Sequence, residues 1–235
     1  MRFDTVLFDL DGTLFDTAPD IYAACNQALE EFGYRRASEE LLGPGLPYGM
    51  RAMLKLAIPQ RDWPKAERGS PMYREFDRLY TENSHALTRP FPGIEELVDD
   101  LERRGIKPGV VTNKYMHMVD ALFEAFPFTK KFKTIVGGDS AARAKPDPDP
   151  IWMAIDECGS TPQRTLYVGD LGSDIAAARN AGVASCAVEW GYGIFMPEPM
   201  EQWGAQYIAS APSEILAIAE GESGPGAPSG KGETK

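Results

Sequence analysis

The strongest constraint on the fold of this chain is a regular alternation of short apolar runs with stretches of helical periodicity. Short apolar runs between turn residues are typical of buried strands, whereas apolar residues three and four positions apart form one face of a helix. Alternating strands and helices predict an α/β fold with a mostly parallel, Rossmann-like sheet covered on both faces. The predicted strands are 5–8, 108–111, 134–136, 165–168 and 183–188, and the predicted helices lie at 94–101, 118–126, 151–158 and 175–181.

One long segment interrupts this alternation. Residues 19–88 contain helical patterns, including an apolar stripe from Ile21 to Phe32 and another from Met72 to Leu87, but no convincing strand. We therefore predict a helical cap domain at 19–88, inserted into a core domain formed by 1–18 and 89–220. The alternative is that these helices only cover one face of the sheet. Residues 221–235 are glycine, proline and small polar residues, which predicts a disordered tail or an expression remnant.

Charge and hydropathy exclude several classes of partner. The 35 acidic and 24 basic residues give a net charge of -11, which argues against a broad electrostatic contact with nucleic acid or with anionic lipid. No apolar run approaches the roughly 18 residues that a spanning helix needs, and acids interrupt the apolar patch at the N-terminus. We expect no membrane contact, no nucleic acid polymer as partner, and a cytoplasmic location.

Cysteine and histidine do not provide a site. Cys25, Cys158 and Cys186 are scattered and form no CxxC pair, so neither a disulfide framework nor a zinc site is predicted. His85 and His117 lie outside any motif for histidine-based catalysis, and we interpret both as structural or surface residues. The carboxylates are therefore the candidates for catalysis.

The first predicted strand ends in a pair of acids. Asp9 and Asp11 are two residues apart and so point to the same side of the chain, and Gly12 permits a tight turn whose backbone N–H groups could face an anion. In an open parallel sheet, ligands bind at the carboxyl ends of the strands. Two neighbouring carboxylates there need a cation or a proton between them. The alternative is an acidic turn with no function.

Polar residues follow three further predicted strands. Thr112 and Asn113 offer donors to a phosphoryl oxygen, or they cap the next helix. Lys145 lies before a proline and could offset the charge of an anionic substrate, or it is a solvated surface residue. Asp170 and Asp174, with glycines nearby, are typical oxygen ligands for Mg²⁺, although Asp174 could instead cap a helix.

Taken together, these motifs resemble those of the haloacid dehalogenase superfamily. FDLDGTL is similar to its first motif, VVTN to its second, the lysine of AKPDPDP to its third and GDLGSD to its fourth. The resemblance extends over residues 1–220 and is strongest to the phosphoglycolate phosphatase-like branch, through DTAPD, FPGIEEL and GGDS. That branch has a Rossmann-like core and a helical cap between the first two motifs, which agrees with the insertion at 19–88.

The resemblance implies a role for each acid. Asp9 would be the nucleophile that forms an aspartyl-phosphate, and Asp11 would protonate the leaving alkoxide and then activate water. The implied Mg²⁺ ligands are Asp9, the backbone carbonyl of Asp11, and Asp170, with Asp174 as a ligand or as a partner of the ligands.

The other motif residues would handle the substrate's phosphate. Thr112, the backbone of Asn113 and the turn at Gly12 would bind the phosphoryl oxygens, and Lys145 would offset the charge of Asp9 and of the phosphate. Metal, lysine and fixed donors address the charge repulsion that makes phosphate monoesters resistant to hydrolysis.

The function predicted from sequence is a Mg²⁺-dependent phosphatase of a small phosphorylated metabolite similar to phosphoglycolate. The alternatives are a phosphomutase, a nucleotide or pyrophosphate phosphatase, a dehalogenase and a non-catalytic binding protein. Thr13 is more typical of hydrolases than of mutases. The dehalogenases lack an acid at the position of Asp11. The loop 42–47 and Arg51 in the cap are candidates for substrate selection, Arg51 as the anchor of a second anionic group. The sequence does not distinguish a monomer from a homodimer.

Overall fold

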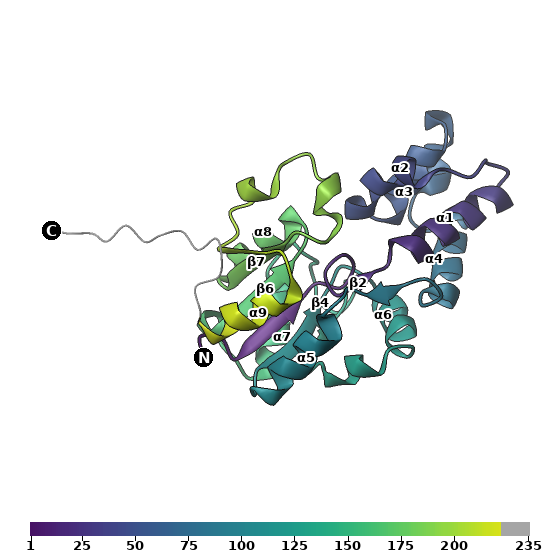
Figure 1. The fold of residues 1–235 in the computed structure, drawn as a ribbon. Helices are drawn as coiled ribbons and strands as arrows, with labels where there is room; N and C mark the ends of the chain where they lie inside the picture. The colour runs from purple at the N-terminus through teal and green to yellow at the C-terminus, as the bar shows by residue number, and fades with distance from the viewer. Residues whose placement is uncertain (222–235) are drawn as a thin grey trace.

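The computed structural model describes residues 1–221, so the tail predicted at 221–235 lies outside the described residues except for Gly221. A parallel sheet of six strands forms the centre of the core. The cap helices lie beyond the carboxyl ends of these strands (Figure 1). This confirms the predicted α/β fold. The strands, in sheet order, are β5 (Ile135–Val136), β4 (Lys107–Val111), β1 (Thr5–Phe8), β6 (Thr165–Gly169), β7 (Ala184–Val188) and β8 (Tyr207–Ala209).

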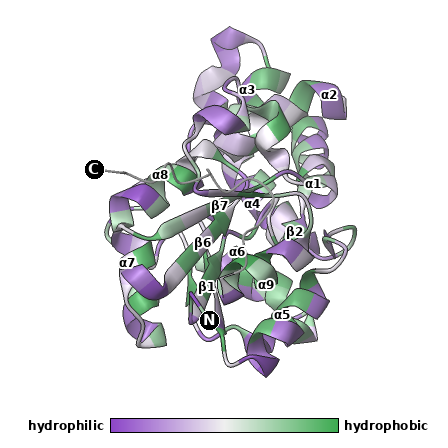
Figure 2. Ribbon diagram, turned by 60° about the vertical axis from the view of Figure 1, so that its left-hand side comes forward, coloured by the Kyte–Doolittle hydropathy of each residue, from purple (hydrophilic) through white to green (hydrophobic). Residues whose placement is uncertain are grey.

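The central strand β1 is buried on both faces. Val6 and Phe8 pack into the apolar cluster on one face, and Leu7 packs into the cluster on the other, as the two-residue period of a strand requires. Apolar strands between helices with polar outer faces are visible in Figure 2. Helices α5 (Ile94–Arg103), α6 (Met116–Phe123) and α9 (Pro212–Glu220) contribute to the first cluster, and α7 (Asp149–Cys158) and α8 (Gly172–Ala181) contribute to the second.

Two predicted helices end earlier than their apolar stripes suggested. Helix α6 ends at Phe123 rather than near Phe126, because Phe126 precedes Pro127 and a residue before proline disfavours the helical conformation. Helix α4 (Pro71–Asn83) ends before Leu87, which is exposed and donates its backbone N–H to the Asp20 carboxylate.

Residues 19–88 contain helices and no strand. After α1 (Ala18–Glu31) come α2 (Glu39–Leu42), the 3-10 turn η1 (Gly43–Tyr48), α3 (Met50–Ala57), the 3-10 turn η2 (Gln60–Ala66) and α4. Their buried side chains form a separate apolar cluster. We call residues 19–88 the cap and the remaining described residues the core; the division into two domains at these boundaries stays a prediction.

The chain passes between core and cap twice, at adjacent positions. Strand β2 (Phe15–Asp16) pairs antiparallel with β3 (Arg89–Pro90), and Asp20 accepts hydrogen bonds from the backbone N–H groups of Leu87 and Thr88. Both passages coincide with the segments in which we expect a hinge. None of the helices within residues 1–221 combines the length and the apolar character that a membrane crossing requires.

Candidate active site

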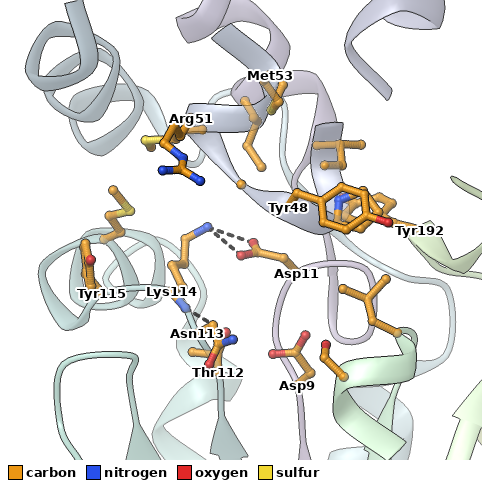
Figure 3. Close-up of a pocket in the computed structure, with 18 of the residues that line it drawn as sticks. Asp9, Asp11, Tyr48, Arg51, Met53, Thr112, Asn113, Lys114, Tyr115 and Tyr192 are labelled. Carbon is orange, nitrogen blue, oxygen red and sulfur yellow. Dashed lines mark hydrogen bonds and ion pairs between the residues drawn. The ribbon is translucent and has the colours of Figure 1, made fainter. Parts of the chain in front are cut away.

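The ends of four strands open into one cavity between core and cap. Its volume is about 610 Å³. Asp9 and Asp11 follow β1, Thr112 and Asn113 follow β4, and the segments after β5 and β6 bring in Lys145 and Asp174. The cap contributes one wall, on which Tyr48, Arg51 and Met53 face the core residues (Figure 3).

Lys145 is a buried lysine at the base of this cavity. Its Nζ lies 2.8 Å from Asp9 Oδ1 and 2.7 Å from Asp174 Oδ1, and it donates to the phenol of Tyr167 at 2.8 Å. Burial acts to lower its pKa, but the carboxylates of Asp174 and Asp9 outweigh burial, and the pKa of Lys145 is raised above its ordinary value. The lysine is therefore charged, and the interpretation as a solvated surface residue was wrong.

Asp9 lies close to the ammonium group of Lys145, but this lysine does not complete the hydrogen bonding of the Asp9 carboxylate. Burial raises its pKa from 3.8 to about 6, although Lys145 acts in the opposite direction. Its Oδ1 contacts Lys145 but has no well-directed hydrogen bond among the described residues. An oxygen with an available lone pair, in a cavity at the end of β1, is suited to attack an electrophile or to bind a cation.

Three buried carboxylates form a cluster that can hold a metal ion. Ligand oxygens of Asp9, Asp170 and Asp174 lie within 4.8 Å of one another. Burial, together with the charges of Asp174 and Asp9, raises the pKa of Asp170. One lysine cannot neutralise three adjacent carboxylates, so the residues present fit a divalent cation with oxygen ligands.

Asp174 also serves the helix that carries it. Its Oδ2 accepts a hydrogen bond from the backbone N–H of Leu171 at 3.0 Å, at the start of α8, while Oδ1 contacts Lys145. Asp174 is therefore not the N-cap residue, which is Leu171, but it binds the N-cap backbone from the third helical position, and this contact coexists with a place in the carboxylate cluster.

Gly12 contributes to the site through its lack of a side chain. Its φ of +83° disfavours other residues, and a Cβ there would lie 2.2 Å from Asp170 Oδ2. Its backbone N–H donates to the Phe15 carbonyl at 2.9 Å. The turn therefore uses this one donor itself, and the expected contact of the turn's other N–H groups with a phosphoryl group stays a prediction.

A second buried lysine, which the sequence analysis did not assign, binds Asp11. Lys114 Nζ lies 2.8 and 3.0 Å from the two carboxylate oxygens of Asp11 (Figure 3). It also donates to the phenol of Tyr80 at 2.7 Å. Tyr80 belongs to the cap helix α4, so this contact connects cap and core. The only sequence signal for Lys114 was its position directly after the polar pair that follows β4.

Thr112 and Asn113 lie where the sequence predicted, at the end of β4 and on the cavity wall. The Asn113 side chain also binds the backbone of Lys145, because its Nδ2 donates to the Lys145 carbonyl and its Oδ1 accepts from the Lys145 N–H, each at 3.0 Å. This pair of hydrogen bonds joins the segment after β4 to the segment that carries Lys145.

The cap candidates line the same cavity. Arg51, on α3, is 60% exposed at its side chain and pairs with Glu67 at 3.1 Å. The predicted loop 42–47 largely coincides with the 3-10 turn η1, in which a Cβ on Gly45 would lie 2.9 Å from Met53 Cα. Leu46 and Pro47 line the cavity, and a role of this loop in substrate selection stays a prediction.

Comparison with known proteins identifies the class to which this site belongs. Residues 6–188 match the family model described as haloacid dehalogenase-like hydrolase. An N-acetylmuramic acid 6-phosphate phosphatase of Pseudomonas aeruginosa is 35% identical over 93% of this chain and 95% of its own length. A phosphoglycolate phosphatase of Xanthomonas campestris is 36% identical over 92% of this chain and 96% of its own.

The solved structures agree with the sequence relatives. The crystal structure of a predicted phosphoglycolate phosphatase from Haemophilus somnus superposes with a TM-score of 0.80 and 28% identity, covering 93% of this chain and 98% of that one. The chain belongs to the haloacid dehalogenase-like hydrolase family. Within that family it is a phosphoric monoester hydrolase similar to the phosphoglycolate phosphatases.

Proposed function

We propose that the protein is a Mg²⁺-dependent phosphatase that hydrolyses a small phosphate monoester through an aspartyl-phosphate on Asp9. The observation that carries this proposal is the arrangement around Asp9. A buried carboxylate with an available oxygen lies against Lys145 and shares a cluster with Asp170 and Asp174, at the end of a cavity open to substrate. This arrangement suits nucleophilic attack on phosphorus, because Lys145 and a bound cation together would compensate the charge around Asp9.

Asp9, Asp170 and the backbone carbonyl of Asp11 would hold the ion, with Asp174 as a ligand or as a partner of the ligands. When bound, Mg²⁺ supplies positive charge to the transferring phosphoryl group and removes the repulsion between the carboxylates. Lys145 contributes a further positive charge beside Asp9.

The chain's own residues account for the two half-reactions. In the first, Asp9 Oδ forms a bond to phosphorus as the bond from phosphorus to the ester oxygen breaks, and Asp11 gives its proton to the departing alkoxide. In the second, Asp11 takes a proton from water, the water oxygen bonds to phosphorus, and the bond to Asp9 breaks. Lys114, whose Nζ lies 2.8 Å from Asp11 Oδ1, is placed to keep the Asp11 side chain in position through both half-reactions.

The cationic wall supports a substrate that carries an acid group besides its phosphate. Lys114, Arg51 and Arg68 all line the cavity, in a chain whose net charge is -11. The two relatives described above act, by their names, on phosphoglycolate and on N-acetylmuramic acid 6-phosphate, both of which combine a carboxylate with a phosphate ester. We therefore favour a phosphoglycolate-like acid.

Cavity size favours a second candidate, a phosphorylated sugar acid. About 610 Å³ is more than a small acid occupies, and flat aromatic side chains are suited to pack against a sugar ring. The tyrosines that line the cavity are Tyr48, Tyr73, Tyr80, Tyr115 and Tyr192.

The test is a comparison of kcat/KM for phosphoglycolate, N-acetylmuramic acid 6-phosphate, glucose 6-phosphate and p-nitrophenyl phosphate, with Mg²⁺ and with EDTA. We expect turnover that EDTA abolishes and Mg²⁺ restores, and a preference for the two acids over glucose 6-phosphate. Absence of turnover on every ester would contradict the proposed function, and a preference for glucose 6-phosphate would contradict the acid-bearing substrate. The cytoplasmic location and the oligomeric state stay predictions.

A further inference from the structure

A segment of the core that the proposed chemistry does not use connects the carboxylate cluster to the hinge of the cap. Gly191, Tyr192 and Gly193 follow β7 and lie directly against Asp170. A Cβ on Gly191 would lie 2.4 Å from the Cβ of Asp170, and one on Gly193 would lie 2.6 Å from the Asp170 carbonyl oxygen. Only glycine allows the backbone to approach Asp170 this closely from both sides.

Tyr192 contacts Asp170 through its backbone. Its N–H donates to Asp170 Oδ2 at 2.8 Å, and Thr13 donates to the other oxygen, Oδ1, at 2.9 Å. The orientation of the Asp170 carboxylate is therefore set by two donors, one of which moves with the segment 191–193.

The phenol of Tyr192 binds the segment of the chain that passes from the core into the cap. Its phenolic oxygen accepts the backbone N–H groups of Thr17 and Ala18, at 2.7 and 2.8 Å, and donates to Asp16 Oδ1 at 3.0 Å. These N–H groups belong to the start of α1, where Thr17 makes no side-chain cap of its own. A tyrosine from a distant part of the chain thus accepts the hydrogen bonds of free N–H groups at the N-terminus of this helix.

Burial makes these contacts strong and specific. Tyr192 is 8% exposed and packs in the cap's apolar cluster, although it belongs to the core. The ring of Tyr192 is rigid, and the flexible torsions of the side chain all lie near the backbone. A shift of the backbone therefore moves the phenol, and a shift of the phenol moves the backbone.

We propose that Tyr192 is a positioning residue that couples cation binding at Asp170 to the orientation of the cap. A cation that fixes the Asp170 carboxylate would also fix the backbone of Tyr192, and through its phenol the N-terminus of α1 and the hinge residue Asp16. Conversely, a movement of the cap at this hinge would shift Asp170. The inference rests on the proposed Mg²⁺ site, and it adds that metal occupancy and cap position are linked.

Hydrogen–deuterium exchange in the substrate-free enzyme tests this proposal without relying on turnover. In the wild type, Mg²⁺ should slow exchange of the amides of Thr17 and Ala18 by about fivefold or more, together with those near Asp170. In Tyr192→Phe the backbone N–H remains, so calorimetry should find Mg²⁺ affinity within about threefold of wild type, but the protection of the hinge amides by Mg²⁺ should disappear.

Controls separate coupling from general loosening. Tyr22 is a buried tyrosine on helix α1, and its hydroxyl makes no hydrogen bond within residues 1–221. Tyr22→Phe removes this hydroxyl and should behave like wild type. Asp16→Ala, which removes only the acceptor of the phenolic proton, should weaken the hinge response in a chain that keeps Tyr192.

Three results would overturn the proposal. If Mg²⁺ binds the wild type but leaves the hinge amides unchanged, the coupling is wrong and the proposed function stands. If Mg²⁺ protects the hinge equally in wild type and in Tyr192→Phe, the phenol does not transmit the effect. If calorimetry detects no Mg²⁺ binding to the wild type, both the proposed metal site and the coupling are wrong.

Discussion

In the absence of metal, we expect Asp9→Asn to stabilise the fold at neutral pH. Burial raises the pKa of Asp9 from 3.8 to about 6, so the folded state disfavours the ionised carboxylate. At about 1.4 kcal/mol per pKa unit, keeping Asp9 ionised in the folded state costs about 3 kcal/mol. Asparagine mimics the protonated form, avoids this cost, and leaves Lys145 its ion pair with Asp174.

The sign of the pH dependence follows from the raised pKa. Well below pH 3.8 the carboxyl is protonated in both folded and unfolded chains, and Asp9 adds no penalty. As the pH rises through about 6, the unfolded chain has already ionised and the folded one ionises at a cost. The stability advantage of Asp9→Asn should therefore grow from about 1.6 kcal/mol at pH 5 to about 3 kcal/mol at pH 7.5.

The assay is urea denaturation of both proteins in EDTA at several pH values, compared as free energies of unfolding. Asp156→Asn, at an exposed carboxylate on α7, controls for the loss of one negative charge. Excess Mg²⁺ should stabilise the wild type more than Asp9→Asn. An advantage that stays constant with pH, or a less stable Asp9→Asn at pH 7.5, would refute the interpretation of Asp9 as a desolvated carboxylate whose charge Lys145 alone does not compensate.

Three further substitutions test other parts of the site. Gly12→Ala places a Cβ against Asp170 in a left-handed conformation, and we expect denaturant unfolding to record a loss of about 2–4 kcal/mol; a loss below about 0.5 kcal/mol would contradict the steric role. Asp170→Ala should leave the circular dichroism unchanged while calorimetry finds Mg²⁺ affinity reduced by more than about tenfold, and an unchanged titration would remove this residue from the metal site. Lys114→Met should lower kcat by about 100-fold, because Lys114 is buried against Asp11, whereas Arg51→Ala should cost less than about tenfold because Arg51 is exposed; the reverse order would contradict this ranking.

The parts of the fold that local pattern determines were predictable. Strand β1 has the predicted bounds, because an apolar run of four residues buried on both faces is followed at once by the acid Asp9. Strands β2, β3 and β8 were not predicted. They span two or three residues each, and pairing with distant segments, such as Phe15 with Pro90, makes them strands. Such pairing leaves no periodicity in the sequence.

The candidate site divides in the same way. Asp9, Asp170 and Lys145 could be predicted, because each follows a strand and parallel strands end at one edge. Lys114 and Tyr192 could not, because their partners Tyr80 and Thr17 belong to the cap or its entrance, and the approach of cap to core is decided by tertiary packing. The spacing of the sequence motifs contains no information about that approach.

The central claim is that Asp9 forms a covalent phosphoryl intermediate, and trapping that intermediate tests it most directly. The enzyme would be mixed with a turned-over ester and Mg²⁺, quenched in acid within the first turnover, and digested for mass spectrometry, with Asp9→Asn treated identically. Our account predicts one added phosphoryl group on the wild-type peptide that contains Asp9, lost on incubation at neutral pH, and no phosphoryl group in Asp9→Asn. The account would be contradicted by a wild type that releases phosphate although no phosphorylated residue is detected, or by a phosphoryl group on a residue other than Asp9.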